Sequence, residues 1–364
     1  MTLSIISILV LFSVIILVHE TGHFLTARRV GIRVEKFSLG FGPRIFSVKR
    51  GDTVYQLSLL PFGGFVKLAG EEEVGEKEVY EEWEYMGKSP GHRSQVIVAG
   101  SLGNLILAFL LLIPVFMIGV PGYDGTKIGS FVEGLPAETS GLKVGDEVLE
   151  VNGITCKEWF DVLINIRKAT DSSHTTPVEL TVKRGTEIIK VKVMPALYRG
   201  GGGLSNSKPM YILGISPMEK IEKYGPGKAV IRASKEFSMM IQSIFIAIKM
   251  LITKQASPKQ LSGPVGIAKW GAEIARSGIS RFLYYIAFIS INLGVINLVP
   301  FPVLDGGHLF GLLCEKVIGR RPSKKVLEWS GYIGFILIIG LALYVTYNDI
   351  LRVLEEVVAS RKGG

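Results

Sequence analysis

The sequence predicts a polytopic α-helical membrane protein in which four spanning helices are combined with a membrane-associated β-sheet and one α+β domain outside the membrane. Hydrophobic residues make up 48% of the 364 residues, and the mean hydropathy is +0.38. The apolar residues gather in blocks long enough to cross a bilayer, which takes roughly 20 residues. Between these blocks lie two regions in which β-prone runs alternate with glycine and proline turns.

Four apolar blocks are predicted to span the membrane. No Lys or Arg precedes the first block and no small-residue cleavage site follows it, which indicates an uncleaved helix rather than a signal peptide. A further block, Ala229–Lys254, has only about 12 uncharged residues in a row, so it is too short to span and is predicted to lie in the membrane interface. The spanning blocks are Leu3–Val18, Val96–Val120, Phe282–Val299 and Gly331–Tyr347.

The charge distribution predicts a lipid partner and a membrane orientation. The formal net charge is +9, but no basic patch is interleaved with aromatics, so anionic lipid headgroups are expected and nucleic acid is not. Basic residues follow the first block at Arg28 and Arg29 and lie between the third and fourth at Lys316 and Arg320. Both loops are therefore predicted to be cytoplasmic, and the segment between the second and third blocks to be outside.

This arrangement divides the chain into four parts and separates its two cysteines. Cys156 and Cys314 fall on opposite sides of the membrane, so no disulfide between them is expected. The parts are an N-terminal membrane region 1–120, an extramembrane domain 121–200, a linker with the interfacial helix 201–280, and a C-terminal membrane region 281–364.

Residues 33–70 are predicted to form the small sheet. One interpretation is a cytoplasmic sheet, and the other is a sheet that dips into the membrane beside the helices, where protein or a water-filled cavity must cover its backbone. The apolar run LLPFGGF favours the second. Residues 71–84 are acidic and are predicted to be a solvated loop or mobile helix. The expected strands are Phe37–Leu39, Ile45–Val48, Val54–Leu60 and Phe65–Leu68.

The outside domain is predicted to run from Gly125 to about Leu197, with a helix over Lys157–Lys168. The segment GLKVGDEVLEVNG, residues 141–153, resembles the core of a PDZ domain, and Gly200–Gly203 indicates a flexible linker after it. A PDZ-like domain could bind a carboxyl-terminal peptide near Thr126–Ser130, or could exclude substrates with bulky outside domains. The expected strands are Lys127–Val132, Glu147–Val151, Val178–Val182 and Ile188–Val193.

The first block ends in the motif HETGH, which points to a metal site. On a helix His19 and His23 lie four residues apart on one face, so both imidazoles can reach one ion, and Glu20 is placed to act as a general base on water. Ionisable groups in a spanning helix cost at least a few kcal/mol, so they are expected to be functional. The motif lies about 24 Å along the helix from Leu3, near the cytoplasmic edge of the bilayer.

A catalytic zinc site needs a third protein ligand and an open position. The strongest candidate is Asp305 in NLVPFPVLDGGHLF, because its prolines interrupt the third block and place this carboxylate at a depth similar to that of HETGH. His308 is a rival beyond a Gly-Gly turn. His92 precedes the second block without a partner motif, and His174 falls in the outside domain.

The paired motifs HETGH and NLVPFPVLDGG resemble the signatures of the site-2 protease family, the zinc intramembrane proteases. FGPRIFS, PFGGFVKLAGE and SGPVGIAK, together with the PDZ-like domain, resemble its bacterial RseP-type branch in the cytoplasmic (inner) membrane. The resemblance covers nearly the whole chain in order. The best-known enterobacterial members carry two tandem PDZ domains, whereas this sequence holds only one.

The resemblance implies one Zn²⁺ per chain, with His19, His23 and Asp305 as ligands and Glu20 as catalytic base. Asn297 is implied to contact the substrate or the reaction intermediate, and the Phe37–Leu68 region to hold the substrate as an added strand. Further implied substrate contacts are Pro300, Pro302, Phe62, Gly63 and Gly64, with Ile128, Gly129 and Ser130 as the PDZ ligand loop.

The implied reaction is cleavage within the transmembrane segment of a single-pass membrane protein that another protease has already trimmed. An anti-sigma factor and remnant signal peptides are the implied substrate classes. Two other functions are compatible with parts of the sequence: a catalytically silent membrane scaffold, and a transporter, since intramembrane ionisable residues and broken helices mark transporters too. The intact Glu20 disfavours the scaffold, and the absence of an inverted sequence repeat disfavours the transporter.

Overall fold

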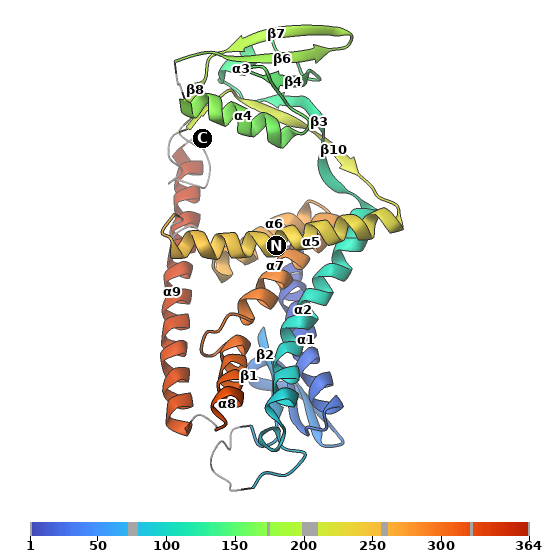
Figure 1. Ribbon diagram of the computed structural model, residues 1–364, viewed down its shortest axis with the longest axis vertical. Helices are drawn as coiled ribbons and strands as arrows, with labels where there is room; N and C mark the ends of the chain where they lie inside the picture. Colours follow the sequence, from blue (N-terminus) through green and yellow to red (C-terminus); the bar gives the residue numbers. More distant parts are fainter. Residues whose placement is uncertain are drawn as a thin grey trace. The chain divides into compact units, whose positions relative to one another are not determined.

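The computed structural model describes residues 2–71, 79–172, 175–198, 210–255, 261–320 and 323–362. The chain divides into two compact units, which are drawn in Figure 1. One unit comprises Met1–Ile118 and Tyr224–Val353, and the other comprises Gly119–Lys223 and Leu354–Gly364.

Four helices of the described chain are long and apolar enough to cross a membrane, as predicted. They are α1 (Thr2–Arg29), α2 (Pro90–Ile118), α7 (Ile279–Asn297) and α9 (Lys324–Lys362). The apolar stretches that qualify within them are Ile6–Arg29, Pro90–Ile118, Ile279–Asn297 and Glu328–Leu354.

The first unit is organised around α2, which packs against α1, α7, the amphipathic helix α5 (Pro226–Ile252) and α8 (Asp305–Ile318). As predicted for its region, α5 is not among the candidate spanning helices of the described chain. Helix α6 (Pro264–Arg276) packs on α1 and α7. Leu11 and Ile15 of α1 form a buried cluster with Phe282 and Ile286 of α7.

Two long strands, β1 (Val34–Arg50) and β2 (Thr53–Leu68), fold into the predicted small sheet. Lys36 of β1 pairs with both Val54 and Lys67 of β2, so the first half of β1 lies between the two halves of β2. The tip of the hairpin, 44–50, forms one edge of this antiparallel sheet and 64–68 forms the other. All four predicted strands are therefore confirmed.

The described part of the acidic segment after the sheet, residues 79–84, is a mostly exposed loop, as predicted, except at its last residue. Val79 is 83% exposed and Trp83 is 37% exposed, whereas Glu84 is 3% exposed. The guanidinium of Arg33 lies 4.1 Å from the centroid of the Trp83 ring. The backbone N–H of Tyr85 donates to Ala69, which ties the short 3-10 helix η1 (Tyr85–Gly87) to the end of the sheet. Residues 72–78 lie outside the described residues.

The second unit is an α+β domain built on one antiparallel sheet with strand order β10-β3-β4-β6-β7, in which the short β5 pairs with β4. Its core contains Trp159 and Val162 of α4 (Trp159–Ser172) against Val148, Leu180 and Val182 of the sheet. The strands are β3 (Val120–Phe131), β4 (Glu147–Val151), β5 (Ile154–Thr155), β6 (Val178–Arg184), β7 (Glu187–Val193) and β10 (Ile215–Glu222), and a short helix α3 covers Pro136–Thr139.

The predicted boundary at residue 200 is wrong. A second small pairing joins β8 (Ala196–Tyr198) to β9 (Met210–Ile212), and β10 pairs with β3. The chain thus returns to the domain after residue 209 and adds an edge strand, which the predicted linker did not anticipate. The predicted Gly200–Gly203 linker itself lies outside the described residues.

Candidate metal centre

The motif residues His19 and His23 lie on the second half of α1 and share the face that packs against α2. Gly22 makes this packing possible, because a Cβ there would lie 2.2 Å from the carbonyl oxygen of Ala99. Gly100 of α2 has the same role from the other side, since its Cβ would collide with the His23 imidazole. Two glycines therefore allow α1 and α2 to touch beside the histidines.

The predicted break in the third candidate spanning helix is present, and Asp305 lies directly after it. Helix α7 ends at Asn297, and α8 begins at Asp305. Val303 in the connection has φ 80°, an uncommon conformation for a β-branched residue. Gly306 and Gly307 allow the turn to close, because a Cβ on either would lie within 2.3 Å of the backbone oxygens of Val299 and Phe301.

Three candidate ligand atoms converge, one each from His19, His23 and Asp305. The two Nε2 atoms lie 3.2 Å apart, and Asp305 Oδ2 lies 3.4 Å from His19 Nε2 and 3.6 Å from His23 Nε2. The side chains are largely buried, with exposed fractions of 11%, 15% and 20%. A tetrahedral zinc ion with bonds of about 2.0–2.1 Å separates its ligand atoms by about 3.3 Å, so the donor set fits zinc.

The orientation of the His23 imidazole also fits a metal ligand. Its Nδ1 lies 2.8 Å from the carbonyl oxygen of Val96. A carbonyl can only accept, so the proton is on Nδ1 and the lone pair on Nε2 points toward His19 and Asp305. Two imidazole nitrogens and a carboxylate oxygen thus face one another around a point that suits a cation.

Glu20 lies beside this group of three, on α1. The backbone of β2 approaches it closely, because a Cβ on Gly64 would lie 2.9 Å from Glu20 Cγ. Gly63 has φ 134°, and its Cβ would overlap the ring of Phe41. The predicted GG pair is therefore a place where an edge of the sheet passes the acidic side chain, which only glycine permits.

The other predicted substrate-contact residues lie around the helix break. Asn297 is the last residue of α7, and Pro300 lines a cavity of about 520 Å³ together with Leu298 and Gly306. Pro302 contacts α9, where a Cβ on Gly334 would lie 2.7 Å from the proline Cβ. Phe62 belongs to β2, next to Gly63.

The two other described histidines, His92 and His308, are not part of the group. His92 lies near the start of α2 and its Nδ1 is 3.0 Å from Ser89 Oγ. His308 lies in the first turn of α8, and the metal-competent group found among the described residues does not include it. His174 lies outside the described residues.

The predicted peptide-binding residues Ile128, Gly129 and Ser130 stay a prediction, and the structure places them within a paired strand rather than in a loop. These residues belong to β3, which lies inside the sheet between β10 and β4. The Ile128 N–H donates to Asp146, the Ile128 carbonyl accepts from Gly145, and Ser130 pairs with Ser216. An added peptide strand needs an unpaired edge, which β3 does not offer.

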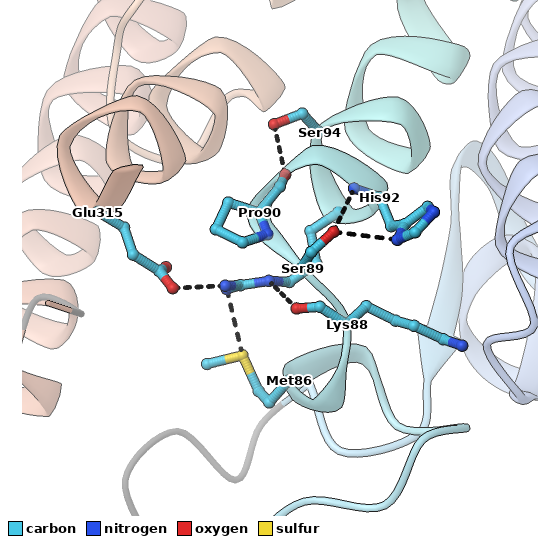
Figure 2. A network of polar contacts seen from close by, with 8 residues as sticks. Met86, Lys88, Ser89, Pro90, His92, Ser94 and Glu315 are labelled. Atoms are coloured by element: carbon cyan, nitrogen blue, oxygen red, sulfur yellow. Dashed lines mark hydrogen bonds and ion pairs between the residues drawn. The ribbon is translucent and has the colours of Figure 1, made fainter. Parts of the chain in front are cut away.

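The sequence analysis missed a buried ion pair that ties α8 to α2. The guanidinium of Arg93 donates to Glu315 at 2.6 Å, and the two side chains are 3% and 11% exposed. Arg93 Nε also donates to the Lys88 carbonyl, and Nη1 approaches the Met86 sulfur (Figure 2). Because Glu315 and Asp305 share α8, this pair fixes the helix that carries the carboxylate. The sequence feature that could have indicated this ion pair is the charged Arg93 at the start of an otherwise apolar helix.

Comparison with known proteins agrees with this geometry. The model of peptidase family M50 matches residues 7–341. A Clostridium perfringens protein whose name places it among the zinc metalloproteases is 36% identical over 344 residues, covering 94% of this chain and 97% of that protein.

Two further relatives extend the agreement. Zinc metalloprotease RasP of Shouchella clausii is 29% identical over 435 residues, covering 97% of this chain and 100% of the relative. Regulator of sigma-W protease RasP of Bacillus subtilis is 28% identical over 428 residues, covering 96% and 98%. The resemblance noted from the two motifs is confirmed: the chain belongs to peptidase family M50, the site-2 protease family of metalloendopeptidases.

Proposed function

We propose that this chain is a zinc-dependent intramembrane endopeptidase in which His19, His23 and Asp305 hold the ion and Glu20 is the general base. The observation that carries the proposal is the convergence of two imidazole nitrogens and one carboxylate oxygen within 4.8 Å of one another. They come from helices about 280 residues apart in sequence, at the end of one candidate spanning helix and directly after the break of another.

The chemistry divides between the ion and the protein. When bound, zinc supplies the Lewis acidity that polarises a peptide carbonyl and acidifies water. Glu20 takes the proton of the attacking water and returns it to the leaving amide nitrogen. The packed helices around the site limit the access of bulk water, and their burial of the three ligand side chains strengthens the electrostatic interactions there.

The sheet gives the substrate a way to present its scissile bond. A helical transmembrane segment hides its carbonyls in hydrogen bonds, so it must be extended before hydrolysis. The segment 64–68 of β2 forms an edge of the sheet among the described residues, where a substrate could be added as a further strand, and Gly64 at its start lies against Glu20. A substrate strand on this edge would pass directly in front of the proposed base.

The expected substrate is the transmembrane segment of a single-pass protein that a first cut has trimmed. Anti-sigma factors are the favoured class, supported by the sigma-W regulator among the relatives, and remnant signal peptides are the second. We place the catalytic end of α1 on the cytoplasmic side of a bacterial inner membrane, on the basis of Arg28 and Arg29. The α+β unit would then be outside as a PDZ-like filter against bulky substrates, and α5 would lie in the interface.

The test is cleavage of a truncated single-pass substrate by the purified full chain in detergent, comparing wild type with Glu20→Gln. Both proteins are expected to bind one zinc, because Glu20 is not a ligand. Wild type is expected to cleave, and the variant to lose about 10²–10⁴-fold in rate, the usual contribution of a general base.

Three outcomes contradict the proposal in different ways. Equal cleavage by both proteins would remove Glu20 from the chemistry. Bound zinc without cleavage of several truncated single-pass substrates would favour the silent scaffold. Failure of the wild type to bind zinc would remove the metal centre itself.

A further inference from the structure

One stretch of α2, residues 96–104, has polar groups near all three proposed ligands. Val96 accepts a hydrogen bond from His23, the Ser101 hydroxyl approaches Asp305, and the Asn104 amide approaches His19. We infer that Ser101 and Asn104 are positioning residues of the metal centre, Asn104 for the tautomer and ring orientation of His19 and Ser101 for the carboxylate of Asp305. The inference rests on the proposed zinc site.

Asn104 is buried in the helix bundle with its amide directed at His19. The residue has 0% exposed surface, and its side-chain nitrogen lies 3.4 Å from His19 Nδ1. Its own backbone carbonyl accepts a hydrogen bond of 2.8 Å from Ser290 on α7, which fixes this turn of α2. A polar amide held at full burial requires partners, because an unpaired buried polar group costs about 1–3 kcal/mol.

The side-chain oxygen of Asn104 lacks such a partner in the part of the chain that the structure describes. An Asn amide has nearly the same shape with its oxygen and nitrogen exchanged. A zinc ion on His19 Nε2 requires the proton on Nδ1, which then needs an acceptor. Exchanging the two amide atoms places the unpaired oxygen opposite that Nδ1–H, so one rotation satisfies both groups.

Ser101 plays the corresponding role for the carboxylate. It is fully buried, and its hydroxyl donates to Asp305 Oδ2 over 3.4 Å. That oxygen is the same atom that faces both histidines. A donor at this atom orients the carboxylate toward the imidazoles, as hydrogen-bonded partners of metal ligands commonly do.

The experiment measures the zinc affinity of the full chain in detergent by competition with a chelator, without reference to cleavage. Asn104→Leu keeps a similar volume but removes the acceptor, and Ser101→Ala removes the donor. Each is expected to weaken zinc binding by about 10-fold, the low end of the 10–100-fold range for such partners.

Matched controls separate positioning from packing. Ser94→Ala removes a hydroxyl from the same helix, and that hydroxyl donates to the Pro90 carbonyl one turn away. Asn292→Leu removes an amide on α7 that donates to the Phe288 carbonyl. Both are expected to bind zinc like wild type. Asn104→Asp retains an acceptor toward His19 and is expected to stay within about threefold of wild type.

The outcomes are distinct. If wild type binds zinc and Asn104→Leu and Ser101→Ala bind it equally well, the inference is wrong while the metal site stands. If wild type binds no zinc, the proposed site itself fails. Should Asn104→Leu not yield folded protein, Asn104→Ala replaces it as the variant without an acceptor, and Ser101→Ala is tested as before. A loss of zinc affinity in Asn104→Asp equal to that in Asn104→Ala would overturn the role of the acceptor.

Discussion

Two buried aspartates, one in each unit of the molecule, are surrounded in opposite ways. Asp146 of the α+β unit has a side chain only 1% exposed. Both of its oxygens accept hydrogen bonds of 2.8 Å from Arg184, and the Lys143 N–H adds a third. Asp305 of the helical unit is 20% exposed and faces two imidazoles. Its other hydrogen-bond partner within the described chain is the Ser101 hydroxyl, at 3.4 Å.

The difference separates a structural carboxylate from a functional one. A buried carboxylate needs compensation by a cation or by hydrogen bonds. Asp146 receives both from the protein itself, so its site is complete and stabilises the start of β4. Asp305 faces two imidazole nitrogens and one long hydrogen bond from Ser101, so a bound cation would supply the matching charge. The surrounding donors therefore distinguish the two carboxylates.

The largest expected effect comes from removing each of these two carboxylates in turn. Asp305→Ala is expected to abolish tight zinc binding and peptidase activity, a loss well beyond the 10–100-fold caused by an outer partner. Asp146→Ala is expected to leave zinc affinity unchanged but to destabilise the α+β unit by about 2–3 kcal/mol, the scale of charge-assisted hydrogen bonds. Zinc competition and thermal unfolding of both variants check this, and a loss of zinc in the Asp146 variant would contradict the distinction.

The buried pair of Arg93 and Glu315 sharpens the comparison inside the helical unit. Arg93→Met removes the cation that faces the buried carboxylate of Glu315 and is expected to destabilise the unit by about 3–5 kcal/mol. The double variant Arg93→Met with Glu315→Leu is expected to recover most of that stability, because a buried pair is often replaceable by apolar residues.

Thermal unfolding in detergent measures both variants of this pair, and zinc affinity shows whether α8 still delivers Asp305. A double variant that is no more stable than Arg93→Met would show that the pair does more than compensate charge.

The smallest effect is a pH dependence of the α+β unit. Burial would raise the pKa of Asp146, but the hydrogen bonds from Arg184 and the Lys143 N–H hold that pKa below its usual range. A depressed folded-state pKa stabilises the fold fully above the unfolded pKa of about 3.9, and the contribution is lost as pH falls through the folded value. The free energy of unfolding of the α+β unit, followed by the fluorescence of buried Trp159, is therefore expected to decrease as the pH falls below about 3.9. The free energy of unfolding of Asp146→Asn should fall less steeply with decreasing pH than that of wild type.

The helices and strands were largely predictable because each is encoded locally. Length and hydropathy located all four candidate spanning helices. The alternation of β-prone runs with turn residues located the strands of the small sheet and β3, β4, β6 and β7 of the α+β domain, but not β5 or β10. The burial of Glu84 was not predictable in this way. The acidic composition of residues 79–84 indicates a solvated loop, and most of them are exposed, but the fold buries Glu84 beside the end of the sheet.

The extramembrane domain shows a second limit. The strand that holds Ile128 and Ser130 was identified correctly, but sequence gives no information on which strands lie at an edge. The return of β10 after residue 209 covers β3 and makes it an interior strand. Long-range pairing of this kind depends on the whole sheet, so a peptide-binding role could not be assigned from the strand alone.

The sequence by itself determined the donors of the candidate site, because a helical repeat fixes His19, Glu20 and His23 on one turn and the prolines before Asp305 fix the break of a helix. Only the tertiary structure decided that these donors meet and which groups stand behind them. Ser101 and Asn104 belong to an apolar helix, and the local sequence pattern indicates only that this helix is buried. Their alignment with two ligands depends on the close approach of α1 and α2 at Gly22 and Gly100, a contact between segments about 80 residues apart.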